Sequence, residues 1–254
     1  MVSKKTKREY NAFSGGGNVR LIVNADDLGY SRGVNCGIAD AHVHGIVTSA
    51  SAMANMPAFR HAADTVRALV TLGVGLHFNI TCGRPLADGV STLTDANGYF
   101  MGPGTVFDPQ NDIDPYHIRL ELHAQMQAFL KSGCRPTHID SHHHVHTAPA
   151  VADTFSDFAR TLGLPVRAAA NSEVALCTGF HAQNAQAAWL ISYLDACTEE
   201  TVELMTHPGF VDQALLSGST YALPRAREHA VLTSKEIREY MQTRGIRLIR
   251  HDEV

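Results

Sequence analysis

Carboxylate and imidazole side chains follow four short apolar runs of this 254-residue chain. They are Asp26 and Asp27, His77, the tract 138–146 and His207. Aspartate and histidine together suit two tasks, holding a divalent cation and transferring protons. Because the carboxyl ends of parallel strands meet at one face of a βα fold, we expect these side chains to become neighbours.

Asp26 and Asp27 are adjacent and directly follow an apolar run. Successive side chains of extended backbone point to opposite sides, so one carboxylate can bind a cation while the other acts as a base. Alternatively, Asp27 or Ser31 satisfies the free amide groups at the start of the next helix. The residues alone leave both interpretations open.

Histidine is concentrated in one part of the chain, where five of the 15 histidines fall within nine positions: His138, His142, His143, His144 and His146. Neutral imidazole is a common ligand of Zn²⁺, and the spacing of His142 and His146 would place both on one face of a helical turn. At most two of the five can bind one ion directly, so the others support the site, face the substrate or bond to the backbone. We expect His138 and Asp140 to be supporting residues on the strand itself.

His77 lies in an otherwise apolar run, where a lone histidine is more often a hydrogen-bonded core residue. Asn79 shares its face of the predicted strand, so the end of that face is polar, as the wall of a site would be. His207 precedes Pro208 and Gly209, which form a sharp exit from a strand. General-acid and structural roles of His207 are equally open at this point.

The framework for these residues is predicted from hydrophobic patterning, in which short β-rich runs alternate with segments of helical period. The predicted strands are residues 19–24, 47–53, 74–81, 137–140, 165–168, 201–206 and 246–249. The predicted helices are residues 31–44, 58–72, 115–131, 148–162, 182–196 and 234–243. This alternation predicts an α/β fold, an irregular TIM-like (β/α) barrel, with an open doubly wound sheet as the alternative.

We expect residues 1–18 to form a flexible N-terminal arm and residues 19–254 to form one domain. Residues 82–114 are rich in glycine and proline with little periodicity, which is typical of a lid or a binding loop. A second irregular stretch is predicted over residues 208–225.

Composition excludes several classes of partner. The formal charge is −4, with 21 Lys and Arg against 25 Asp and Glu, so the chain lacks a strongly basic balance that would favour nucleic acid. No run reaches the roughly 18 apolar residues of a membrane span. The five cysteines form no CxxC pair, which favours a reducing cytoplasm over a disulfide framework. Formation of a homodimer stays open.

Five strings, taken in order, resemble the YdjC-like carbohydrate deacetylases, the group that includes chitooligosaccharide deacetylase and the hopanoid-associated deacetylases. They are IVNADDLG (22–29), GIVTS (45–49), GLHFNIT (75–81), PTHIDSHHHVH (136–146) and ELMTHPG (203–209). The match runs from about residue 19 to the C-terminus. Leu28 stands where the family more often has Phe.

The resemblance implies a distorted (β/α) barrel and one divalent metal ion held by Asp27, His77 and His142, with His146 as an alternative to His142. One carboxylate and two imidazoles suit Zn²⁺ best, while Mg²⁺ and Mn²⁺ prefer oxygen ligands. The resemblance therefore predicts zinc, with magnesium or manganese as alternatives.

The resemblance further implies Asp26 as the catalytic base and His207 as the acid. The expected enzyme is a carbohydrate N-deacetylase, which hydrolyses the N-acetyl group of an amino sugar or oligosaccharide to acetate and a free amine. A hydrolase of a phosphoester or cyclic amide is the alternative, but only Arg84 and Arg167 lie near strand ends to hold a phosphate, and Arg167 is equally a supporting or substrate-facing residue. A non-catalytic metal-binding protein would account for the histidines alone.

Overall fold

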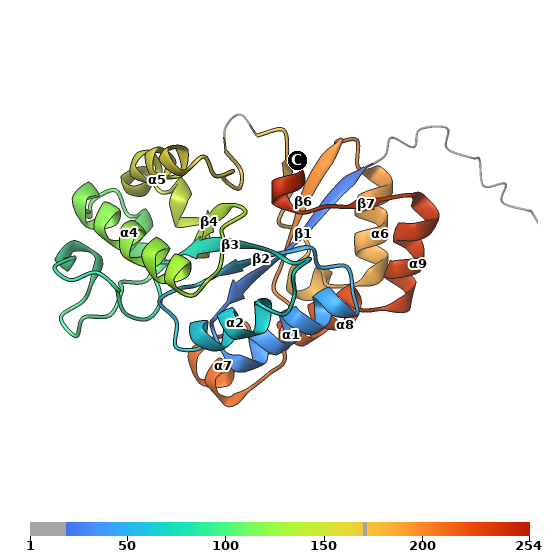
Figure 1. The fold of residues 1–254 in the computed structure, drawn as a ribbon, viewed down its shortest axis with the longest axis horizontal. Coiled ribbons are helices and arrows are strands. Elements are labelled where there is room, and N and C mark those ends of the chain that lie inside the picture. The colour runs from blue at the N-terminus through green and yellow to red at the C-terminus, as the bar shows by residue number, and fades with distance from the viewer. Residues whose placement is uncertain (1–18, 170–171) are drawn as a thin grey trace, which may run out of the picture.

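Strand β1 (Arg20–Leu28) is the centre of a parallel sheet, and all its residues after Arg20 are buried. The computed structural model describes residues 19–169 and 172–254 (Figure 1). The predicted arm, residues 1–18, lies outside the described residues, so its separation from the domain 19–254 stays a prediction.

The sheet runs in the order β4-β3-β2-β1-β6-β5, and β7 pairs with the start of β1. The other strands are β2 (Ser49–Ala52), β3 (Gly73–Phe78), β4 (Ile139–Ser141), β5 (Ala175–Cys177), β6 (Thr201–Thr206) and β7 (Arg247–Leu248). Val166 adds one parallel bridge beside Ile139. Among the described residues this edge does not pair with β5, so the sheet curls without closing into a full barrel. The predicted irregular, TIM-like (β/α) architecture is thus confirmed.

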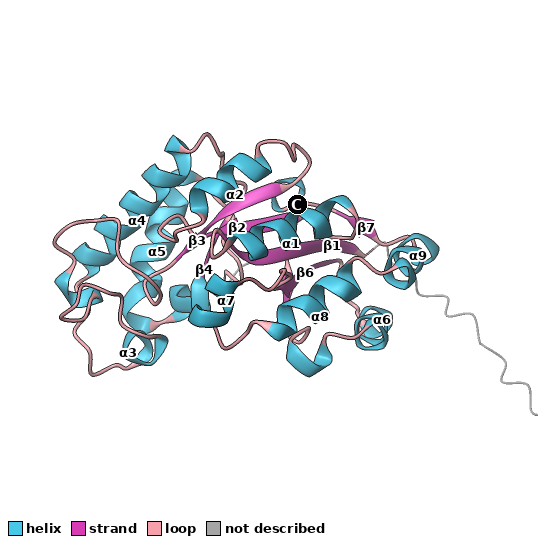
Figure 2. Cartoon of the chain, turned by 90° about the horizontal axis from the view of Figure 1, so that it is seen from below, coloured by secondary structure: helices cyan, strands magenta, loops and turns pink. Residues whose placement is uncertain are grey.

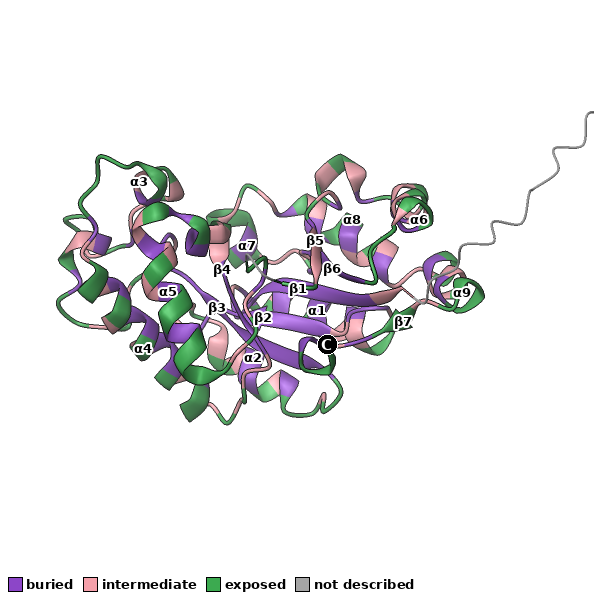
Figure 3. Ribbon diagram, turned by 90° about the horizontal axis from the view of Figure 1, so that it is seen from above, coloured by how far each residue is buried: buried purple, intermediate pink, exposed green. Residues whose placement is uncertain are grey.

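Helices lie around the sheet (Figure 2). They are α1 (Arg32–Val43), α2 (Phe59–Val66), α3 (Pro103–Phe107), α4 (Pro115–Lys131), α5 (Pro149–Leu162), α6 (Ala187–Ala196), α7 (Gln213–Gly218), α8 (Leu223–Leu232) and α9 (Lys235–Arg244). Short 3₁₀ turns are η1 (Ser91–Leu93), η2 (His142–Thr147), η3 (Ala182–Asn184) and η4 (His251–Glu253). Apart from β5, β7 and the first residue of β1 the strands are buried, and the helices expose their outer faces (Figure 3). No helix of the described residues is both long and apolar enough to span a bilayer.

The cap of α1 settles one alternative about the residues that follow β1. The Ser31 side chain accepts a hydrogen bond from the Val34 amide, and the backbone of Ser31 is extended. Ser31 therefore caps α1. The carboxylate of Asp27 makes other contacts, described below.

Several predicted elements differ from the structure. Residues 165–168 contribute only the single bridge at Val166, and the unpredicted strand β5 pairs with β6 instead. Residues 208–225, predicted as irregular, contain α7 and the start of α8. β5 and α7 are short, so their few residues give hydrophobic patterning little to detect. Helix α8 has ten residues and was also not predicted.

The long stretch 82–114 is packed into the protein. Phe100, Val106 and Ile113 are buried, and α3 packs against η2. The Glu121 carboxylate on α4 accepts hydrogen bonds from two amides of this stretch. Residues 82–114 therefore pack against the histidine tract through α3. Their predicted role as a lid or a binding loop stays a prediction.

Candidate active site

The end of β1 positions two carboxylates that point to different neighbours. Asp26 and Asp27 lie within β1, where the register with β2 shifts between Ala25 and Leu28. Asp27 has φ +70°, in the left-handed region that a non-glycine residue rarely adopts. Such a conformation costs free energy and is found preferentially at functional sites. The local irregularity of β1 thus separates the two adjacent carboxylates.

Asp27 faces two imidazoles, as one of the predicted ligand sets requires. Its Oδ1 lies 2.8 Å from Nδ1 of His142 and 3.3 Å from Nε2 of His77, and one ligand atom from each of the three residues lies within 4.8 Å of the others. The Oδ1 atom is buried and has no hydrogen bond of good geometry. An orphaned carboxylate oxygen beside two imidazole nitrogens fits a divalent ion that prefers nitrogen and oxygen ligands.

A second group, formed by Asp26, His77 and Asp140, also has ligand atoms within 4.8 Å of one another. The buried Arg167 guanidinium fills this group. Its two terminal nitrogens lie 2.6 and 2.7 Å from the oxygens of Asp26, and one lies 2.9 Å from Asp140. A cation already compensates these carboxylates, so the Asp27 group is the better candidate of the two for holding a metal ion.

Arg167 joins three strands by its ion pairs. Besides Asp26 on β1 and Asp140 on β4, its Nε donates to Glu203 on β6 at 2.6 Å. Burial opposes the charge on Arg167, but the carboxylates outweigh it and raise its pKa well above the ordinary value. Burial likewise raises the pKa of Asp26, yet the Arg167 charge prevails and leaves that pKa below its usual value. Asp26 is therefore ionised near pH 7.

Asp140 orients His77 toward Asp27. Its Oδ1 lies 2.7 Å from Nδ1 of His77, and its Oδ2 accepts a hydrogen bond from the Ser51 hydroxyl at 2.7 Å. Burial lowers the pKa of His77, but the Asp140 charge more than reverses this and raises it to about 10. A carboxylate on one ring nitrogen fixes the ring orientation, and a metal ion at the other nitrogen would have to displace the proton that this raised pKa keeps there.

The outer oxygen of Asp27 pairs with a residue that the sequence analysis missed. Nη2 of Arg225, on α8, lies 2.5 Å from Oδ2 of Asp27. Burial raises the pKa of Asp27, but the His142 imidazole and Arg225 outweigh it and hold that pKa well below its ordinary value. Arg225 leaves only Oδ1 free to face the two imidazoles.

His207 follows β6 directly and lines the same cavity as Asp26. Its Nδ1 is buried without a hydrogen-bond partner, and its backbone N–H donates to the Glu228 carboxyl group on α8. Burial lowers the pKa of His207 to about 4, against the opposing charges of the two aspartates. The imidazole is therefore neutral near pH 7.

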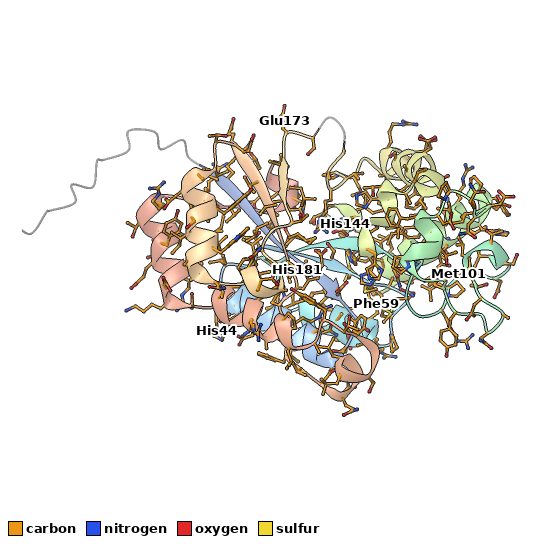
Figure 4. The ribbon with its side chains drawn as sticks, turned by 180° about the vertical axis from the view of Figure 1, so that it is seen from behind. His44, Phe59, Met101, His144, Glu173 and His181 are labelled. Atoms are coloured by element: carbon orange, nitrogen blue, oxygen red, sulfur yellow. The ribbon has the colours of Figure 1, made fainter. Side chains whose placement is uncertain are left out.

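The two aspartates of β1 and the imidazoles beside them line one cavity of about 500 Å³, within the size range of small-molecule sites, roughly 300–1,000 Å³. Arg167 and Asp140 are not among its lining residues. Figure 4 labels His144 and His181, which both line this cavity. The predicted residues that line it are Asp26, Asp27, His77, His142 and His207. Further lining residues, which the sequence analysis did not assign to the site, include Tyr30, Cys82, His181, Tyr221 and Arg225.

Three predicted supporting residues lie behind the cavity wall. His138 contacts the Ser51 hydroxyl and stacks on His251 at 3.7 Å between ring centroids. The Oδ1 of Asn79 accepts hydrogen bonds from two amides of the following turn. His146 contacts the Ser141 hydroxyl at 2.6 Å.

The predicted pairing of His142 and His146 on one helical face is wrong. His143 and His144 have φ of 53° and 55°, so the backbone is left-handed between His142 and His146 and forms no regular helix there. Of His142 and His146, His142 is the one that reaches Asp27, and the structure therefore favours it as the third member of the group.

Comparison with known proteins identifies relatives over nearly the whole chain. The sequence profile of the family described as "YdjC-like protein" matches residues 20–243. A carbohydrate deacetylase of Geobacillus stearothermophilus is 42% identical over 91% of this chain and 96% of its own. A chitooligosaccharide deacetylase of Proteus mirabilis is 40% identical over 90% of this chain and 96% of its own.

A solved structure from Enterococcus faecalis V583, described as a candidate cellobiose-phosphate cleavage protein, superposes with a TM-score of 0.85 and 32% identity. The superposition covers 93% of this chain and 98% of the Enterococcus faecalis chain. The shared architecture therefore extends over both chains almost completely.

Proposed function

Since this chain belongs to the YdjC-like family, we propose that it is a metal-dependent deacetylase that removes the acetyl group from an N-acetylated amino sugar. Curated relatives that align over at least nine-tenths of the chain are named carbohydrate or chitooligosaccharide deacetylase. The observation that carries the proposal is the group of Asp27, His77 and His142, placed beside Asp26 in one cavity.

Asp27, His77 and His142 are the residues that would hold the ion, and one carboxylate with two imidazoles favours Zn²⁺ over Mg²⁺ or Mn²⁺. A bound ion would supply Lewis acidity to the acetamide carbonyl and to the attacking water. Asp140 holds the His77 ring in place, and Arg225 restricts Asp27 to one free oxygen.

Asp26 acts as the base that takes a proton from the water as the water oxygen bonds to the carbonyl carbon. Arg167 holds both Asp26 oxygens, so the carboxylate is fixed before substrate arrives. The C–N bond then breaks and leaves acetate and an amine, which takes up a proton. His207 is the proposed donor. Because burial keeps it neutral near pH 7, the proton that reaches the amine must be replaced by the one that Asp26 took from the water, which also restores the Asp26 carboxylate.

Acetate release from N-acetylglucosamine and from its di- and trisaccharides tests this proposal. We expect acetate with one or more of these sugars, loss of activity after chelation, and recovery when Zn²⁺ is returned. Absence of acetate from every sugar with metal-loaded protein would refute the proposed function, and hydrolysis of p-nitrophenyl phosphate would support a phosphoesterase instead.

A further inference from the structure

One wall of the cavity contains two stacked rings that the proposed reaction does not use. His181, just before η3, and Tyr221, between α7 and α8, have ring centroids 4.5 Å apart and planes inclined by 22°. Both side chains line the cavity that holds Asp27 and His207. The His207 ring meets the Tyr221 ring edge-on at 5.6 Å. The stacked pair is therefore next to the proposed acid.

A buried carboxyl group fixes this pair. The Tyr221 hydroxyl donates to Oε1 of Glu228 and accepts a hydrogen bond from the Ala182 amide at 2.7 Å. The other Glu228 oxygen accepts from the His207 backbone. Glu228 thus sets the position of the stacked rings relative to His207, although the three residues come from different elements.

The pair lies on the open side of the cavity. His181 is exposed and Tyr221 partly buried, whereas Asp27 and His77 are almost fully buried. Figure 4 places His181 near the middle of the molecule, where the strands converge. An acetamide carbonyl must reach the buried Asp27 group, so the next sugar of the same substrate would extend toward the exposed rings.

We propose that His181 and Tyr221 form the specificity-determining surface that binds the sugar ring next to the acetylated one. This inference rests on the proposed function. Pyranose rings present apolar C–H faces, and planar side chains in ligand pockets pack against such apolar surface while polar groups fix orientation. Tyr221 stacks on one face of the His181 imidazole, which leaves the other, exposed face available to the sugar ring.

The test compares N-acetylglucosamine with N,N′-diacetylchitobiose in the metal-loaded His181→Ala protein. We expect kcat/KM for the disaccharide, relative to that for the monosaccharide, to fall roughly three- to ten-fold, the effect of losing one aromatic-type contact. His44→Ala is the matched control, because His44 is exposed at the end of α1 and does not line the cavity. An unchanged ratio in His181→Ala would overturn the inference.

A binding measurement separates this inference from the proposed chemistry. Trp189 is the only tryptophan of the sequence, and its ring centroid lies 6.2 Å from that of Phe180, the residue before His181. Its fluorescence is therefore suited to report binding of a sugar at His181. In an Asp26→Asn background we expect His181→Ala to raise the Kd for diacetylchitobiose roughly three- to ten-fold. If the wild type releases no acetate but this Kd still rises, only the proposed function fails. An unchanged Kd would refute the ring-binding surface.

Discussion

Replacing Asp26 by Asn tests the division of work between the two adjacent aspartates. Asp26 Oδ1 accepts hydrogen bonds from Arg167 and from Asn24, and Oδ2 accepts from Arg167 at 2.6 Å. An amide can keep the two bonds to one oxygen, but its NH₂ group then faces an Arg167 N–H. The variant therefore loses one charge-assisted hydrogen bond, worth about 1.5–3 kcal/mol.

This cost is small enough for the variant to fold. Arg167 keeps Asp140 and Glu203 as partners, and domains are typically stable by about 5–15 kcal/mol. At about 2–4 °C per kcal/mol for a protein of this size, we expect the melting temperature to fall by roughly 3–12 °C. A folded but inactive protein makes the comparison of activities fair.

The Asp26→Asn variant should lose at least about 100-fold in kcat, equivalent to about 2.7 kcal/mol of activation free energy. Its metal content should stay unchanged, because Asp26 belongs to the Arg167 group. Acetate release, elemental analysis and a thermal melt measure these three quantities. Asp27→Asn is the matched variant and should lose metal. An active Asp26→Asn protein, or one without metal, would refute the role of Asp26 as the base.

Other substitutions test the remaining parts of the site. His77→Ala should abolish stoichiometric metal binding in elemental analysis, whereas His146→Ala should retain it; full metal content in His77→Ala would exclude His77 as a ligand. Arg167→Met leaves buried carboxylates without their cation and should destabilise the protein by about 3–5 kcal/mol in urea unfolding. An unchanged unfolding midpoint would show that the ion pairs contribute nothing net. Burial raises the pKa of Glu228 from 4.5 to about 7, so the folded state binds more protons than the unfolded state between these values. Stability should therefore fall by about 3 kcal/mol as pH rises through this window, and Glu228→Gln should flatten that decline in denaturation curves recorded from pH 4.5 to 7. A slope that persists in the variant would assign the effect to another group.

Sequence patterning predicts the part of the site carried by strands. Asp26, Asp27 and His77 lie on or directly after buried apolar runs, and parallel strand ends converge. The prediction that they become neighbours is confirmed. The pairing of His142 with His146 fails because it assumes a regular helix, and the left-handed conformation of the intervening residues depends on tertiary packing.

The part of the site carried by helices was not predicted. Tyr221, Arg225 and Glu228 lie in or next to α8, and their spacing shows no metal-ligand or acid–base pattern. Pro224 near the helix start, followed by alanine, arginine and glutamate, is a usable signal for α8 itself. Which side chains α8 directs toward the cavity depends on how the helix packs against α1 and η3, and hydrophobic periodicity does not predict such contacts.

The ion pairs of Arg167 also determine when the site can form during refolding. Arg167 and Asp26 are 141 positions apart, and the other partners lie on β4 and β6. Contacts of such long sequence separation require closure of large loops, which slows their formation. No segment shorter than that from β1 to β6 brings all the partners together. Recovery of deacetylase activity after dilution from denaturant should therefore follow the last step of chain assembly, later than the return of helical circular dichroism.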